Sequence, residues 1–499
     1  MTAHPEPELA GRAAERHVVV VGGGIAGLVA ARECVKVGMR VTLLEAADEL
    51  GGAVRRADID GVRLDAGAES YATRGGHVRK LVKELGLSDR VQTPAAGGAW
   101  LAGVPGQEPS PLPKGGILGI PANPFVDDVR EIIGWRGAWR AYVDRLRPPL
   151  TIGHERSLGR LVRSRMGARV LERLVAPVVS GVYSAHPDDV DVDVAAPGLN
   201  AALTRVGSLS GAVDALTGQQ QAARKDKAPG SAVEGLVGGM STLVDALHAD
   251  IEKLGGLVRT GAAVESLTRD GVGWTVVFTA DAGAEDPDAA ASDAEPEQES
   301  LSADAVIIAT AEGAARALLD GHVSGLGDAG ASPEIEIVTL LLDAPALDAA
   351  PRGTGVLTVP GSFTAKALTH ATAKWAWLRE AAGSRHVVRV SFGSQGEPAA
   401  TAALDDDAAA RLALDQASAM LGVELSDAQL VGAHRARFTQ SQPASLIGAA
   451  ERRAAARTAV QAVPGLAVVG AWLAGTGLAQ VVPDATAEAD RVRRHLLWD

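Results

Sequence analysis

The stretch VVVVGGGIAGLVAA, residues 18–31, runs from four β-branched residues through three glycines into an apolar segment. The valines predict a buried strand, and the apolar run after the glycines predicts a helix. Gly22, Gly24 and Gly27 have the spacing G-x-G-x-x-G. Such glycines permit a tight turn, a close approach of the backbone to a pyrophosphate, and close packing of helix on strand. By itself this turn is compatible with NAD, with FAD or with no ligand.

Glu45 strengthens the nucleotide interpretation. It ends a second predicted strand, 39–45, which follows the helix at 27–37 and completes a βαβ unit. A carboxylate at this position can accept hydrogen bonds from both ribose hydroxyls and would repel a 2'-phosphate. The pair of features predicts a dinucleotide site without choosing between NAD and FAD.

The end of the chain repeats the order of its beginning. The segment GLAVVGAWLAGTGLAQVVPDATAEADRVRRHLL, from Gly465, reads as strand, glycine turn and helix. With 499 residues, two or three domains are expected. The predicted fold class is α/β and α+β, with a Rossmann-like nucleotide-binding domain, an inserted mixed-sheet substrate domain and a helical module. The expected parts are a flexible tail, 1–16; the nucleotide-binding domain, 17–95, 232–330 and 465–499; the helical module, 100–225; and the substrate domain, 331–464.

Composition excludes several classes of protein. The net charge of -13, with no basic stripe, argues against nucleic acid. Residues 281–300 hold eight acidic and no basic residues, which predicts a disordered loop between two strands. The single cysteine, Cys34, excludes internal disulfides and fits a reducing, cytoplasmic location. No signal peptide and no apolar run of about 18 residues is found, so only peripheral membrane contact stays open.

A second glycine pair, Gly51 and Gly52, follows Glu45, and Gly67 comes after it. This order resembles the flavin amine oxidase superfamily, in which such a pair runs under the FAD pyrophosphate. Three further blocks resemble the oxygen-dependent protoporphyrinogen and coproporphyrinogen III oxidases of haem synthesis: PLPKGGILGIP (111–121), LVAPVVSGVYSAHPDDVDV (174–192) and GTGVLTVPGSFTAKALTHATAKW (353–375). The resemblance covers nearly the whole chain and implies that the cofactor is FAD.

The resemblance also implies which residues hold FAD. It places the first glycine turn and Glu45 on the ADP half, and the backbone of Val264 at the adenine. Gly477 begins a helix whose N-terminal end faces the flavin, where the helix dipole favours the negative charge of the reduced ring. Trp472 fits a wall of the flavin site or a buried position between domains. The predicted cofactor contacts are Gly22, Gly24, Gly27, Glu45, Gly51, Gly52, Ala53, Gly67, Ala68, Val264, Trp472, Gly477, Leu478 and Ala479.

A porphyrinogen is a large apolar macrocycle with carboxylates, so its site should be an apolar slot with one or two cations at its edge. Arg74 and Lys366 are the candidate cations, although a solvated surface position fits each of them as well. The resemblance places Thr354, Val356 and Leu357 along the macrocycle. No nucleophile–base pair and no metal-ligand spacing is present, so neither a catalytic side chain nor a metal ligand is predicted.

The preferred hypothesis is FAD-dependent oxidation of coproporphyrinogen III by oxygen, giving coproporphyrin III and hydrogen peroxide. Alternatives are a protoporphyrinogen IX oxidase, another flavin amine oxidase or desaturase, and a non-catalytic flavoprotein that delivers a tetrapyrrole. Contact with the downstream haem-pathway enzyme also stays open. The chain departs from the resemblance at PASLIGAAERR (443–453), where relatives carry Pro-Gln-Tyr near Gly-His, which predicts altered flavin affinity or substrate choice.

Overall fold

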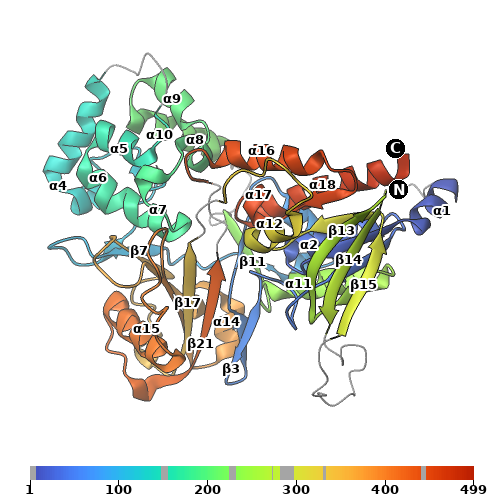
Figure 1. Cartoon of the computed structure of the whole chain (residues 1–499). Coiled ribbons are helices and arrows are strands. Elements are labelled where there is room, and N and C mark those ends of the chain that lie inside the picture. Colours follow the sequence, from blue (N-terminus) through green and yellow to red (C-terminus); the bar gives the residue numbers. More distant parts are fainter. Residues whose placement is uncertain are drawn as a thin grey trace.

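The computed structural model describes residues 7–147, 155–223, 232–271, 273–280, 297–329, 333–439 and 445–498. Figure 1 shows three parts: an α/β part that contains both ends of the chain, a lower mixed sheet, and a helical module above that sheet. The three segments predicted for the nucleotide-binding domain, 17–95, 232–330 and 465–499, thus contribute strands to one sheet although they are far apart in sequence. This arrangement is the predicted α/β and α+β fold class.

A five-stranded parallel sheet forms the centre of the α/β part. Its order is β12-β2-β1-β16-β22. The strands are β12 (Leu257–Arg259), β2 (Arg40–Leu44), β1 (His17–Val21), β16 (Ala305–Ile308) and β22 (Leu466–Val468). All of β16, and β1 after His17, is apolar and buried, as a parallel sheet covered on both faces requires. The strand order reverses at β1, which has β2 on one side and β16 on the other. A ligand is expected to bind outside the carboxyl ends of the strands at such a point.

Three helices cover this sheet: α2 (Ile25–Val35), α11 (Ser241–Lys253) and α18 (Leu478–Trp498). Helix α2 is buried on nearly every side, which explains its almost uniformly apolar sequence. Burial raises the pKa of the Cys34 thiol on this helix to about 12, so the thiol is a packing group. Helix α1 (Pro7–Glu15) buries Ala13 against the same core. The predicted flexible tail is therefore wrong for residues 7–15.

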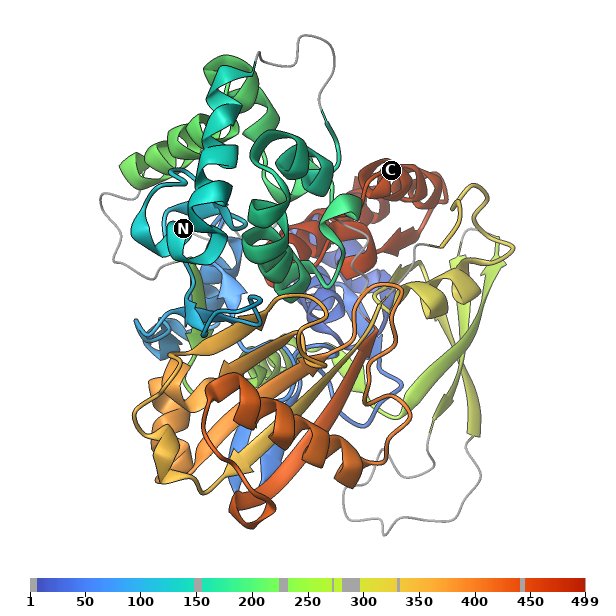
Figure 2. The ribbon, with the colours of Figure 1, turned by 90° about the vertical axis from the view of Figure 1, so that its left-hand side faces the viewer.

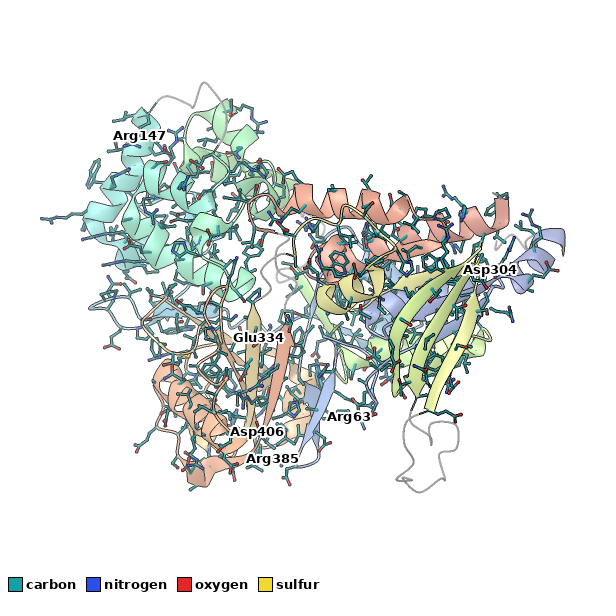
Figure 3. All side chains as sticks on the ribbon, in the orientation of Figure 1. Arg63, Arg147, Asp304, Glu334, Arg385 and Asp406 are labelled. Atoms are coloured by element: carbon teal, nitrogen blue, oxygen red, sulfur yellow. The ribbon has the colours of Figure 1, made fainter. Side chains whose placement is uncertain are left out.

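The two strands that flank the acidic segment pair with each other. Strands β13 (Ala262–Asp270), β14 (Gly273–Ala280) and β15 (Glu297–Ala303) form an antiparallel sheet. The predicted loop, 281–300, is too long at its end because Glu297 to Ser300 pair with β14. Residues 281–296 lie outside the described part. Asp304, labelled in Figure 3, follows β15 and accepts a hydrogen bond from the His17 backbone N–H at the start of β1.

The mixed sheet has seven strands in the order β21-β17-β20-β19-β18-β7-β8. They are β21 (Leu430–Thr439), β17 (Glu334–Leu342), β20 (His386–Phe392), β19 (Ala367–His370), β18 (Gly355–Thr358), β7 (Ala99–Ala102) and β8 (Ser110–Pro111). Helix α15 (Asp406–Leu421) covers its outer face, as Figure 2 shows. The predicted start of the helical module at residue 100 is wrong, since β7 and β8 complete this sheet.

The helical module has a core of its own. It contains α4 (Asp127–Tyr142), α5 (Leu158–Met166), α7 (Ala176–Tyr183), α9 (Leu199–Val206) and α10 (Leu209–Ala223). Helix α16 (Ala449–Gln461) was predicted within the substrate domain, but its Ala456 and Val460 pack with β22 in the α/β part. Within the described ranges, no helix combines the length and apolarity needed to cross a bilayer.

Candidate functional site

The first glycine turn lies at the carboxyl end of β1. The Gly22 N–H donates to the Leu44 carbonyl at 2.7 Å, which places the turn beside the end of β2. A β-carbon on Gly27 would lie 1.9 Å from the Gly22 carbonyl oxygen, so α2 can begin against the turn only with glycine there. Gly22 has φ +107° and faces the Ala309 carbonyl, a conformation that a side chain would strain.

The second glycine pair lies against the first turn. Gly24 and Gly51 form an isolated parallel bridge, and the Gly51 N–H donates to the Gly23 carbonyl at 2.9 Å. A β-carbon on Gly52 would come within 3.3 Å of the Gly24 α-carbon. The two turns thus form one surface of bare backbone, which a pyrophosphate can approach closely.

Ala53 links this surface to the next predicted contacts. Its carbonyl accepts from the Ala68 N–H at 3.0 Å. The same carbonyl would lie 2.0 Å from a β-carbon on Gly67. The backbone of 66–68 therefore folds directly onto the second glycine turn.

Glu45 lies at the end of β2, where its carboxylate faces the first turn. One oxygen accepts from the Gly23 N–H at 2.5 Å and the other from the Ala47 N–H at 2.9 Å. A carboxylate has further lone pairs, so ribose hydroxyls can still be accepted. The Glu45 carbonyl accepts from Ala262 N–H at the start of β13, which brings Val264 to the same end of the sheet.

Helices α2 and α18 pack side by side. Near the C-terminal end of α2, Arg493 of α18 donates to the Glu33 carbonyl at 2.7 Å. At the N-terminal end of α2, a β-carbon on Gly470, in the turn before α17 (Ala471–Ala474), would lie 4.0 Å from Ala26. No side chain caps α2, so its first N–H groups are available to an anion. Gly477, just before Leu478 and Ala479 of α18, has φ +100° and open space where a β-carbon would stand. These residues fit FAD.

Of the two positions that the sequence leaves open for Trp472, the structure shows the buried one. Its ring is 4% exposed and belongs to the core cluster that contains Ala456 and Val468. The Arg316 guanidinium lies over the ring, 5.7 Å from its centroid. The packing therefore supports a buried tryptophan between α12 (Glu312–Leu319) and α16, and does not support a wall of the flavin site.

A buried charge cluster that the sequence did not reveal fixes the backbone of 66–69. Arg389, on β20, donates to the carbonyls of Ala66 at 3.1 Å and Gly67 at 2.5 Å, and to the Glu69 carboxylate at 2.9 Å. Lys374 binds the other oxygen of Glu69. Burial alone would raise the pKa of Glu69, but the two cations hold it at about 2. The mixed sheet therefore positions the predicted flavin-contacting segment.

Arg389 and Glu69 could not be found by spacing, since they are 320 residues apart. Arg389 lies in the largely apolar strand HVVRVSF. A charged residue within such a strand was the one sign in the sequence that this position is unusual. A buried arginine requires a partner, but the sequence does not say which.

Most of the predicted substrate residues come together where the helical module meets the mixed sheet. A β-carbon on Gly181 of α7 would lie 2.6 Å from the Leu357 side chain on β18. Burial raises the pKa of Tyr183, at the end of α7, and the nearby Arg74 lowers it in part. Lys366 donates to the Ser184 hydroxyl at 2.5 Å. Leu357 and Lys366 thus lie against the end of one helix, and the exposed Arg74 is near enough to act on Tyr183 electrostatically.

Val356 and Thr354 do not follow this pattern. Val356 is 1% exposed and packs in the core under α15, because successive residues of a strand face opposite sides. Its side chain therefore points away from α7, and the prediction that it lines the macrocycle is not supported. Thr354 lies at the start of β18, where its hydroxyl donates to the Gly98 carbonyl at 2.9 Å.

The model for flavin containing amine oxidoreductases matches residues 25–493. A coproporphyrinogen III oxidase of Mycobacterium tuberculosis is 31% identical over 93% of this chain and 94% of its own. The chain belongs to this flavoprotein family. Within the family it falls among the porphyrinogen oxidases, and its cofactor is FAD. A coproporphyrinogen III oxidase of Propionibacterium freudenreichii is 28% identical, over 95% of this chain and 90% of its own.

Solved structures show the same fold. A putative protoporphyrinogen oxidase from Exiguobacterium has a TM-score of 0.78 at 22% identity, covering 96% of this chain and 99% of its own. The cyclohexylamine oxidase of Brevibacterium oxydans has a TM-score of 0.60 at 14% identity, covering 96% and 99%. The flavoprotein family therefore keeps this architecture for very different substrates, and the substrate must be argued from the site.

Proposed function

We propose that this flavoprotein oxidises coproporphyrinogen III to coproporphyrin III with oxygen as acceptor and hydrogen peroxide as product. The observation that carries the proposal is the meeting of Lys366 and Leu357 at the end of α7, with Arg74 close enough to lower the pKa of Tyr183. Cations beside an apolar surface suit a macrocycle with carboxylates. The relatives named coproporphyrinogen III oxidase support the same substrate.

The reaction removes six electrons and six hydrogens from the macrocycle, which three molecules of oxygen carry away as three molecules of hydrogen peroxide. FAD, when bound, supplies the two-electron chemistry that links substrate and oxygen. The chain itself binds and orients. In this proposal the two glycine turns and the N-terminus of α2 hold the pyrophosphate, and the N-terminus of α18 favours negative charge on the flavin.

The substrate contacts follow from the same geometry. Arg74 and Lys366 each bind a carboxylate, and Leu357 lies against the ring. Holding the macrocycle in one orientation is the main contribution a protein can make when the cofactor carries the redox step. Arg389 and Glu69 act indirectly, by fixing the segment that contacts the flavin.

Protoporphyrinogen IX is the second candidate substrate. Arg74 and Lys366 approach adjacent residues, Tyr183 and Ser184, so both cations lie near one edge of the site. Protoporphyrinogen IX carries its two carboxylates on neighbouring rings, which fits such an edge. A protoporphyrinogen oxidase of Nicotiana tabacum is 28% identical, but over only 48% of each chain.

Aerobic turnover tests the proposal. Purified protein loaded with FAD is incubated with coproporphyrinogen III or with protoporphyrinogen IX, and porphyrin fluorescence and peroxide are followed together. The proposal predicts faster fluorescence gain with coproporphyrinogen III and peroxide in a threefold molar ratio to porphyrin. A gain no faster than autoxidation with both substrates would refute it, and FAD binding without turnover would favour a delivery protein.

A further inference from the structure

Lys366 is a half-buried cation without an acidic partner among the described residues. It precedes β19, and its ammonium donates to the Ser184 hydroxyl at 2.5 Å. Among the described residues, no carboxylate lies within ion-pair distance of Lys366. Burial lowers the pKa of its ammonium to about 7. A neutral hydroxyl compensates little of the cost of removing an ammonium from water.

Lys374, eight residues further along the chain, provides a comparison, because its ammonium has an acidic partner. It is paired with Glu69, which also binds Arg389. The same region of the fold therefore pairs one half-buried lysine with a carboxylate and leaves the other with a neutral contact. Buried groups whose charge the protein does not compensate occur mainly at functional sites. The missing anion for Lys366 is expected to come from a ligand.

Ser184 supplies a second, independent observation. It caps α7 with φ 52° and ψ 32°, in the left-handed region. Glycine is the usual residue at such a cap, because a β-carbon is strained there. Ser184 is 3% exposed, and the only described contact of its hydroxyl is Lys366. Glycine would fit this backbone with less strain, but it would leave the Lys366 ammonium without its hydroxyl contact.

We propose that Lys366 binds a carboxylate of the substrate and that Ser184 is a positioning residue, whose hydroxyl holds the Lys366 ammonium at the substrate edge of α7. This inference rests on the proposed function, because it takes the ligand to be a porphyrinogen or porphyrin carboxylate. In the free protein the hydroxyl keeps the long side chain in one direction. When the substrate binds, one of its carboxylates provides the negative charge that Lys366 lacks in the free protein. Arg74 binds another carboxylate beside it.

The substitution Ser184→Gly separates this role from a structural one. Glycine relieves the backbone strain, and the Ser184 carbonyl keeps its bond from the Gln395 N–H. The variant should keep its FAD and its melting temperature, or melt higher, while KM for coproporphyrinogen III rises about tenfold with kcat nearly unchanged. Ala350→Gly is the matched control, since Ala350 is also left-handed, with φ 45°, and should leave KM unchanged.

The substitution Lys366→Met tests the cation itself. KM should rise about tenfold or more, and the double variant with Ser184→Gly should be no weaker than Lys366→Met alone, because both act on one contact. Binding of coproporphyrin III and of its tetramethyl ester, followed by quenching of tryptophan fluorescence, provides a readout without turnover. Wild type should prefer the free acid, and Lys366→Met should lose most of that preference.

The outcomes distinguish the two proposals. Active wild type with unchanged KM and unchanged acid preference in both variants overturns the role of Lys366 and Ser184 and leaves the proposed function standing. Additive effects in the double variant overturn the positioning role of Ser184 alone. Wild type that neither oxidises a porphyrinogen nor binds coproporphyrin III overturns the proposed function, and this inference with it.

Discussion

Replacing Arg389 with methionine should strongly lower the free energy of unfolding, although Arg389 lies on a strand of the mixed sheet and not in the nucleotide-binding part. Methionine keeps much of the side-chain volume but removes three hydrogen bonds, to the Ala66 and Gly67 carbonyls and to Glu69. A buried carbonyl left without a donor costs about 1–3 kcal/mol. Breaking a buried ion pair costs about 3–5 kcal/mol. Since Lys374 still binds Glu69, the two carbonyls set the loss, and we expect about 2–6 kcal/mol.

Urea unfolding measures this loss, and the fraction of protein that retains FAD after gel filtration measures its effect on the site. Arg385→Met is the matched control from the same part of the fold. Arg385, labelled in Figure 3, pairs with Asp60, which is 64% exposed, so its loss should cost less than about 1 kcal/mol. An Arg389→Met variant that matches the control in stability and FAD content would refute the positioning role of the charge cluster.

Three further changes test other parts of the account. Gly27→Ala places a β-carbon 1.9 Å from the Gly22 carbonyl oxygen, so this variant should purify without FAD. Its visible absorbance spectrum measures the bound flavin, and a variant that retains flavin would contradict the packing argument. Burial raises the pKa of Asp65 to about 7, which Arg389 and the Met240 N–H offset in part. In the unfolded chain the carboxyl ionises at pH about 4, so Asp65 lowers the free energy of unfolding as pH rises from about 4 to about 7. In urea unfolding, Asp65→Asn should lack this fall. A pH profile identical to that of wild type would contradict the role of Asp65. Lys366, with its pKa at about 7, loses its charge above that pH, so KM for coproporphyrinogen III should rise from neutral to alkaline pH in wild type and stay flat in Lys366→Met.

The nucleotide-binding part could be predicted because its constraints are local. The glycine spacing and Glu45 lie in one βαβ unit, where a strand, a turn and a helix N-terminus follow each other in sequence. The boundaries of the helical module could not be predicted in this way. Strand β7 pairs with β18, more than 250 residues away, as in the pair Gly355 and Ala99, and no local pattern records that pairing.

The substrate side shows the same division. Arg74, Leu357 and Lys366 were selected by residue type and by resemblance, and the fold brings them to one helix end. Val356 was selected with its neighbour, but strand alternation sends it to the opposite face. Ser184 was missed because a serine before a turn is ordinary in sequence. Only its left-handed backbone and its contact with Lys366 reveal its role.

Reduction of the bound flavin by substrate without oxygen is the most direct test of the central claim. Protein loaded with FAD is mixed anaerobically with coproporphyrinogen III, and the visible absorbance of oxidised flavin is followed. We expect this absorbance to bleach and porphyrin to form in proportion, and we expect admission of oxygen to restore the absorbance and to yield peroxide. Flavin that stays oxidised in the presence of excess coproporphyrinogen III and of excess protoporphyrinogen IX would contradict it.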